Sequence, residues 1–98
     1  MKHATPAALD GIEEMLVALR ALEGLREKKR GTFYRGASAF LHFHEDPAGM
    51  FADVKLAGRD FSRLRVSTRS EQHALLSAVR KALARRAAPP SRAAARRS

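Results

Sequence analysis

Apolar residues recur at helical spacing near the start of the chain, from Leu9 onward, and this predicts an amphipathic helix. Thr5 and Pro6 are a suitable beginning, because threonine accepts hydrogen bonds from the first unpaired amides and proline is tolerated at the first helical position. Gly24 is placed to end the helix in a left-handed cap. We therefore predict one helix from Pro6 to about Glu23, preceded by a frayed end at residues 1–4.

A second helical stripe begins at Leu75, after the sequence T-R-S-E at residues 68–71. This sequence fits a capping box, in which the Thr and Glu side chains each satisfy an unpaired backbone amide. We predict that the second helix runs to about Arg86. Residues 87–98 contain only Ala, Pro, Ser and Arg, so we predict a disordered basic tail behind a single domain at residues 1–86.

Between the two helices, aromatic and β-branched residues alternate with polar ones, which is typical of strands. The four predicted strands cover residues 32–35, 39–45, 50–56 and 61–66. The charged residues 26–30 are predicted to be a solvated connector or half of a phosphate-contacting patch. The order α-β-β-β-β-α predicts a two-layer α+β domain, in which an antiparallel four-stranded β-meander is flanked by an N-terminal and a C-terminal helix.

The sequence D-P-A-G at residues 46–49 is the clearest turn signal, since Asp, Pro and Gly occupy the positions that a type I turn favours. A two-residue turn places His42 opposite Asp53. If Gly49 forms a bulge instead, the register shifts by one residue and His42 lies opposite Val54. We predict the first register, because it groups the apolar residues of both strands and leaves the charged ones outside.

The first register predicts an outer sheet face that combines aromatic, histidine and charged side chains. Its members are Phe40, His42, His44, Phe51, Asp53, Lys55, Arg63 and Arg65. Exposed aromatic patches of some size usually have partners. We therefore predict a binding or dimerisation module, with a homodimer as one form of that binding.

His42 and His44 leave the same side of one strand, close enough to grip one metal ion. Zinc and similar ions need three or four ligands, and Asp53 on the next strand could supply a carboxylate. A metal-dependent enzyme using His42 and His44 is thus one alternative. The main prediction is a protein with no cofactor, in which these are ordinary cross-strand histidines.

The formal net charge of the 98-residue chain is +9. Seven basic residues and no acidic residue lie between residue 80 and the C-terminus, so the preceding part is nearly neutral. A basic tail attracts phosphate backbones. Nucleic-acid binding is the other alternative, with Arg63, Arg65 and Lys55 beside aromatic rings on a sheet and the tail as an added contact.

Several classes of function have no support in the sequence. The chain has no cysteine, which excludes disulfides and thiolate sites and fits a cytoplasmic protein. No apolar run is long enough to cross a bilayer and no secretory signal is visible, so we expect no membrane partner. Glycine patterns for nucleotides and G-x-S-x-G are also absent, and we predict that the protein is not an enzyme.

The run F-Y-x-G-x-x-x-F-x-x-x-x-E-D-x-x-G, followed by V-K-L, resembles the strand core of the MmcQ/YjbR-like proteins. The matching residues are Phe33, Gly36, Phe40, Asp46, Gly49, Val54, Lys55 and Leu56. This resemblance implies a helix-flanked antiparallel sheet and suggests DNA binding. The H-x-H strand is also similar to that of a small luciferase-like α+β domain. Neither resemblance supplies catalytic residues.

Overall fold

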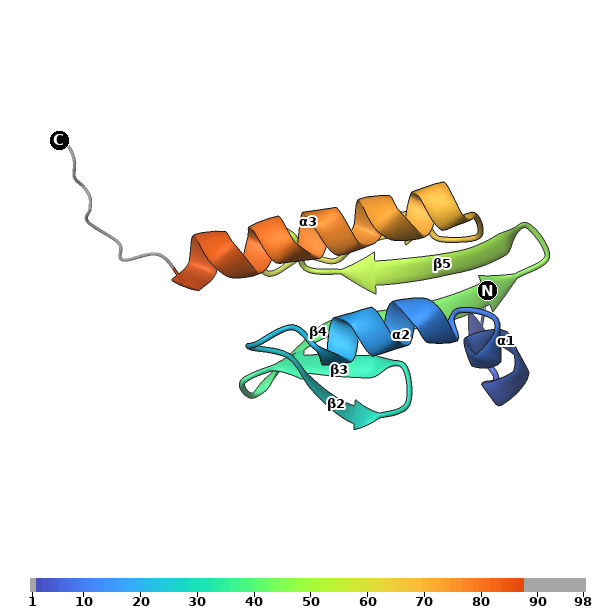
Figure 1. The fold of residues 1–98 in the computed structure, drawn as a ribbon, viewed down its shortest axis with the longest axis horizontal. Helices are drawn as coiled ribbons and strands as arrows, with labels where there is room; N and C mark the ends of the chain where they lie inside the picture. The colour runs from blue at the N-terminus through green and yellow to red at the C-terminus, as the bar shows by residue number, and fades with distance from the viewer. Residues whose placement is uncertain (1, 88–98) are drawn as a thin grey trace, which may run out of the picture.

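The computed structural model describes residues 2–87, and within them a six-stranded antiparallel sheet is covered by helices on one face (Figure 1). The elements are β1 (Lys2–His3), α1 (Pro6–Asp10), α2 (Glu13–Arg20), β2 (Arg26–Lys29), β3 (Thr32–Arg35), β4 (Ser38–Asp46), β5 (Gly49–Val54), β6 (Ser62–Arg65) and α3 (Arg69–Ala87). The strands from β2 to β6 form a meander in sequence order, and β1 pairs with β4. The predicted α+β class is therefore confirmed.

The prediction of four strands missed two strands, one near the N-terminus and one in the charged connector. The charged connector at residues 26–30 is strand β2, which pairs with β3 at the edge of the sheet. Exposed basic side chains suit an edge strand, because they oppose pairing with other chains. The predicted frayed end contains β1, where Lys2 pairs with Glu45 and His3 with His44. The backbone N–H of Ala4 extends this pairing by donating to the Phe43 carbonyl at 3.2 Å.

The single predicted N-terminal helix is two helices, α1 and α2, separated at Gly11 and Ile12. Glycine disfavours a helix interior, and Ile12 adopts a non-helical backbone with φ −121° and ψ 25°. The break lets α1 turn away from α2 so that Leu9 packs against Gly31. Gly31 has φ +81°, and an added Cβ there would lie 2.8 Å from the Leu9 side chain, so this approach requires glycine.

Helix α3 begins with the predicted capping box. The Glu71 backbone N–H donates to Thr68 Oγ1 at 3.1 Å, and the Thr68 N–H donates to Glu71 Oε1 at 3.0 Å. Glu71 Oε1 also accepts from the Ser67 N–H at 2.9 Å. These bonds lower the pKa of Glu71, with the Thr68 N–H as the main cause. The helix extends to Ala87, and the rest of the predicted basic tail lies outside the described residues.

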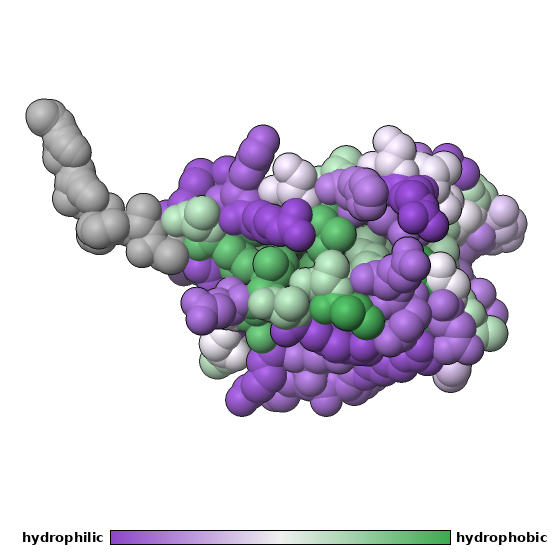
Figure 2. Space-filling model, in the orientation of Figure 1, coloured by the Kyte–Doolittle hydropathy of each residue, from purple (hydrophilic) through white to green (hydrophobic). Residues whose placement is uncertain are grey.

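Helices α2 and α3 lie side by side over one face of the sheet, and the core lies between them and the strands (Figure 1). Apolar surface remains visible along the seam between the two helices (Figure 2). Within residues 2–87, no helix is both long enough and apolar enough to span a membrane.

Phe40 lies in this core, which corrects the prediction that it faces outward. Leu41 pairs with Phe33 and Ala39 pairs with Tyr34, so Phe40 is an extra residue of β4 without a partner in β3. A bulge of this kind re-aims side chains relative to simple alternation. The Phe40 side chain is consequently only 1% exposed.

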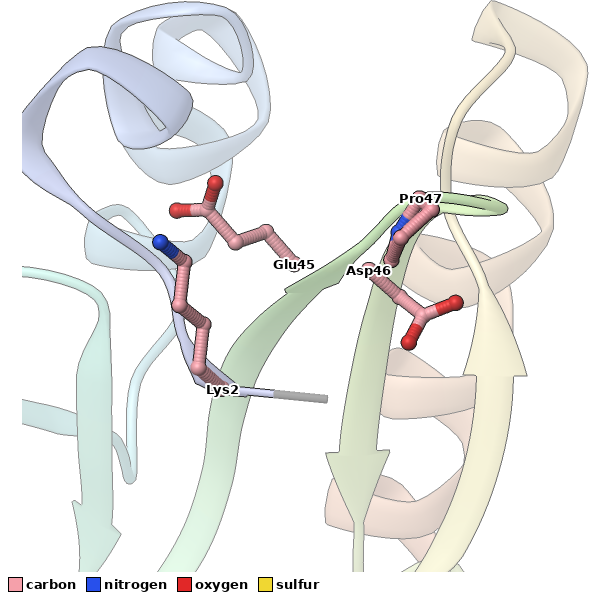
Figure 3. A pocket seen from close by; sticks show the side chains of 4 residues that line it. All are labelled: Lys2, Glu45, Asp46 and Pro47. Carbon is pink, nitrogen blue, oxygen red and sulfur yellow. The ribbon is translucent and has the colours of Figure 1, made fainter.

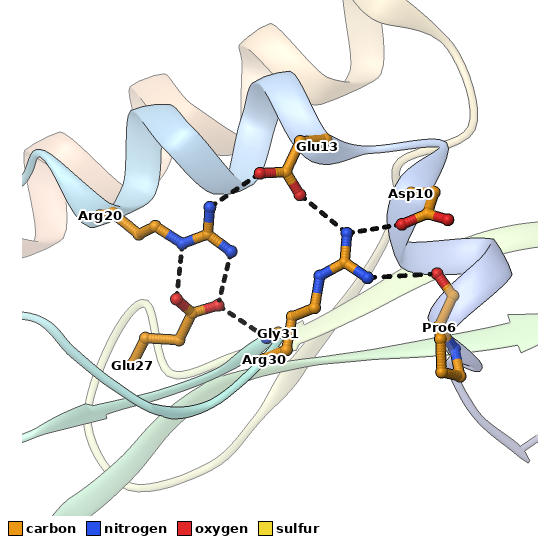
Figure 4. Close-up of polar contacts among 7 residues, drawn as sticks. All are labelled: Pro6, Asp10, Glu13, Arg20, Glu27, Arg30 and Gly31. Atoms are coloured by element: carbon orange, nitrogen blue, oxygen red, sulfur yellow. Dashed lines mark hydrogen bonds and ion pairs between the residues drawn. The ribbon is translucent and has the colours of Figure 1, made fainter.

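An ion-pair network joins the N-terminal helices to the hairpin formed by β2 and β3 (Figure 4). Arg20 contacts Glu13 at 2.9 Å and also pairs with Glu27 on β2. Arg30, in the β2–β3 turn, contacts Asp10 at 2.7 Å and Glu13 at 2.9 Å. Single surface pairs contribute little to stability, but these shared partners link three elements at once and orient the hairpin.

We predict that Phe40→Ala lowers the free energy of unfolding by about 3–5 kcal/mol, the usual range for a buried phenylalanine. The matched control is Phe61→Ala, because Phe61 is 42% exposed and should cost less than about 1 kcal/mol. Urea denaturation of both variants measures the difference. Equal losses in the two variants would contradict the burial of Phe40 through the bulge.

Candidate functional site

The sheet face opposite α2 and α3, here called the open face, carries side chains in two adjacent cross-strand rows. The first row consists of Thr32, His42, Asp53 and Arg63. The second row consists of His3, His44, Phe51 and Arg65. The pairing of His42 with Asp53 confirms the predicted register of β4 and β5. Gly49 follows the two turn residues and has φ +131°, and an added Cβ there would collide with Ser67 Oγ.

The two rows bring together His3, His42 and His44, which we call the histidine triad. One ring nitrogen from each residue lies within 4.8 Å of the nitrogens offered by the other two. The ring centroids of His3 and His44 are 5.0 Å apart, and those of His42 and His44 are 4.9 Å apart. Three imidazoles from two neighbouring strands thus point at one place on the open face.

Asp53 lies beside the triad and is held in place by Arg63. The Arg63 Nε and Nη2 groups donate to Asp53 Oδ1 and Oδ2 at 2.8 and 2.9 Å. This bidentate pair lowers the pKa of the Asp53 carboxyl, so the group is ionised at neutral pH. Asp53 Oδ2 is also 3.0 Å from His44 Nε2, although the ring is not angled for a hydrogen bond. Arg63 therefore engages both carboxylate oxygens, and Asp53 places a negative charge beside the His44 ring.

His42 is half-buried in the middle of the sheet. Burial lowers its pKa, and the neighbouring His44 lowers it further. Its Nδ1 atom is enclosed, yet has no hydrogen-bond partner among the described residues. A buried nitrogen without a partner is costly unless something satisfies it. The neutral ring is the form in which histidine binds a metal ion.

His3 reaches the triad because the N-terminal segment is fastened to β4. The Thr5 backbone N–H donates to Glu45 Oε1 at 2.6 Å, which is the main reason that the pKa of Glu45 is lowered. Lys2 adds a favourable charge, and Figure 3 shows its ammonium group extending toward the Glu45 carboxylate. These contacts line a pocket that Asp46 and Pro47 complete. They lie next to the triad in sequence and fix His3 against His44.

An aromatic ring and a cation border the triad at its other end. The ring of Phe61, just before β6, contacts His42 edge-on with centroids 5.0 Å apart. The Lys55 ammonium lies 5.0 Å from the Phe61 ring centroid, a cation–π contact. His42 is therefore shielded on one side by an apolar ring that is itself capped by a positive charge.

Only some of the side chains that were predicted for the outer face are exposed to solvent in the structure. His42, His44, Phe51 and Lys55 are half-buried, and Arg63 and Arg65 are exposed. Asp53, predicted as a metal ligand, is 8% exposed and bound to Arg63. Phe40 belongs to the core instead. Arg65 contacts Glu71 at 3.3 Å, so both arginines of β6 already have acidic partners.

The third histidine of the triad was missed from sequence. A metal site needs a third ligand, and His3 and His73 were the remaining histidines. His73 is exposed on α3, on the other side of the sheet. His3 lies on a strand of two residues, which is too short for alternation to reveal.

Comparison with known proteins finds no match among family models, curated proteins or solved structures. The resemblances to the MmcQ/YjbR-like proteins and the luciferase-like domain stay predictions. The function is therefore inferred from the triad and its surroundings.

We predict that the metal-free protein loses stability as the pH falls below about 6.5, the ordinary pKa of histidine. Because the pKa of His42 is lowered in the fold, the unfolded chain takes up a proton at higher pH than the folded chain does. The loss should continue until the pH reaches the lowered pKa. Urea unfolding in chelator from pH 8 to pH 5 measures it.

The matched pair of variants for this measurement is His42→Gln and His73→Gln. His42→Gln should flatten the dependence of stability on pH, and His73→Gln, on the exposed side of α3, should leave it unchanged. An unaltered pH dependence in His42→Gln would show that His42 is not the group responsible.

Proposed function

We propose that this protein binds a divalent transition-metal ion, such as zinc, through the histidine triad on its open face. The observation that carries the proposal is the approach of three ring nitrogens within 4.8 Å of one another. A tetrahedral zinc ion with Zn–N bonds of about 2.0–2.1 Å holds its ligand nitrogens about 3.3 Å apart. His3 is exposed, and a small rotation of its ring can close the difference.

The type of ligand suits zinc better than the hard cations. Imidazole favours zinc, copper, nickel and iron, whereas magnesium and calcium prefer oxygen ligands. The three rings are neutral ligands, so the ion would keep its double positive charge. Asp53 supplies the nearest negative charge, at 3.0 Å from the His44 ring. Carboxylates are common outer partners of metal-binding histidines, and a turn of the His44 ring would let its Nε2–H donate to Asp53.

This proposal gives the predicted binding module a specific ligand. Homodimerisation through the open face remains a proposal that nothing in the fold favours over metal binding. A platform for nucleic acid has less support than the sequence suggested. Phe40 is buried and cannot stack on a base, and Arg63 is held by Asp53.

We predict that the protein binds one zinc or cobalt ion per chain in isothermal titration calorimetry. Loss of a residue that only supports a metal ligand weakens metal binding by about 10- to 100-fold. His42→Ala, His44→Ala and His3→Ala should each weaken metal binding by more than this, because each removes a ligand itself. His73→Ala is the control and should bind like the wild type. Absent binding by the wild type, or equal binding by all four variants, would contradict the proposal.

A separate prediction concerns Asp53. Asp53→Asn should keep the three ligands but weaken metal binding by about 10- to 100-fold, because the charge beside His44 is lost. Asp60→Asn, in the exposed loop before β6, is the matched control and should have no effect. The same titration measures both. A metal affinity that survives Asp53→Asn unchanged would show that Asp53 only anchors Arg63.

A further inference from the structure

We infer that the open face binds an oxyanion of the phosphate type, with one anion oxygen on the metal ion of the histidine triad. This inference rests on the proposed metal site and adds the class of ligand. Three protein ligands leave the fourth position of a tetrahedral ion open, which is the arrangement of zinc sites that take water or substrate. Asp53 does not fill this position, because both its oxygens accept hydrogen bonds from Arg63.

The triad lies on the face of the sheet that α2 and α3 leave uncovered (Figure 1). The two histidines of β4 are half-buried in the sheet, and His3 is exposed at its rim. The helices cover the opposite face (Figure 1). An incoming ligand would therefore approach the ion from this side, where His3 is exposed.

Basic residues lie on both sides of the triad in the sheet. Lys29 of β2 pairs with Thr32, which pairs with His42, so Lys29 extends the first row two strands away from the triad. Arg63 ends the same row on β6. Neighbouring strands lie about 4.8 Å apart, so the backbones of Lys29 and Arg63 each lie roughly 10 Å from β4. A long basic side chain can extend over part of this distance. Lys55 adds a third cation, over the Phe61 ring that contacts His42.

The charges on this surface favour a negatively charged ligand. Asp53 is the acidic side chain in contact with the triad, and the bidentate bond from Arg63 already compensates it. Lys29 and Lys55 pair with no carboxylate in the described structure. A divalent ion would add two more positive charges at the centre. A multiply charged anion with several oxygen acceptors, such as phosphate, complements this arrangement.

The cobalt-loaded protein tests this inference, because the visible absorption of cobalt reports a change of ligand. Inorganic phosphate, titrated at constant ionic strength with perchlorate, should produce a saturable change in the spectrum. Lys29→Gln and Lys55→Gln should each raise the phosphate midpoint by about tenfold without changing the cobalt stoichiometry, since each removes one charge-assisted contact. Lys81→Gln, exposed on α3 at the covered face, is the matched control and should leave the midpoint unchanged.

The possible outcomes separate this inference from the proposed function. If cobalt does not bind, the metal site itself is wrong. If cobalt binds but phosphate leaves the spectrum unchanged, the metal site stands and the oxyanion inference fails. It also fails if all three lysine variants give the wild-type midpoint. A nucleoside monophosphate in a parallel titration distinguishes the source of the anion: tighter binding indicates an ester that also contacts Phe61, and equal binding indicates free phosphate.

Discussion

The two-residue turn between Asp46 and Gly49 is the constraint on which the open face depends. It fixes the pairing of β4 with β5 and thereby decides which side of the sheet every side chain of the two strands occupies. A slip of one residue would bring His42 opposite Val54, on the side of the apolar set. The turn therefore determines both the core and the histidine face, because a shift in the register of β4 and β5 would change the residues of both.

The open face also depends on the attachment of β1, a strand of two residues. Two residues of β1 cannot hold their position through backbone pairing alone, and the contacts of Glu45 with Thr5 and Lys2 supply the rest. A metal ion shared by His3 and the histidines of β4 would add a third link between the N-terminus and the sheet. Metal binding and the order of the N-terminal segment should therefore depend on each other.

Local rules were enough to predict the features that neighbouring residues determine. The capping box at Thr68 and the turn before Gly49 follow from the chemistry of a few consecutive residues, and both were predicted correctly. The features that were missed depend on contacts far along the chain. The strand at Lys2 exists because Glu45 lies across from it, and Phe40 turns inward because β4 has one residue more than β3 at that point. The histidine pair was visible in sequence, but its third member required the tertiary fold.

Strand pairing brings three histidines from two strands together, and we propose that they bind one metal ion. Anomalous diffraction at the zinc edge, from crystals of the zinc-loaded protein, would locate this ion. We expect one peak on the open face at about 2.0–2.1 Å from a ring nitrogen of each of His3, His42 and His44. No peak at this position, or a peak bound by His42 and His44 with His3 turned away, would contradict it.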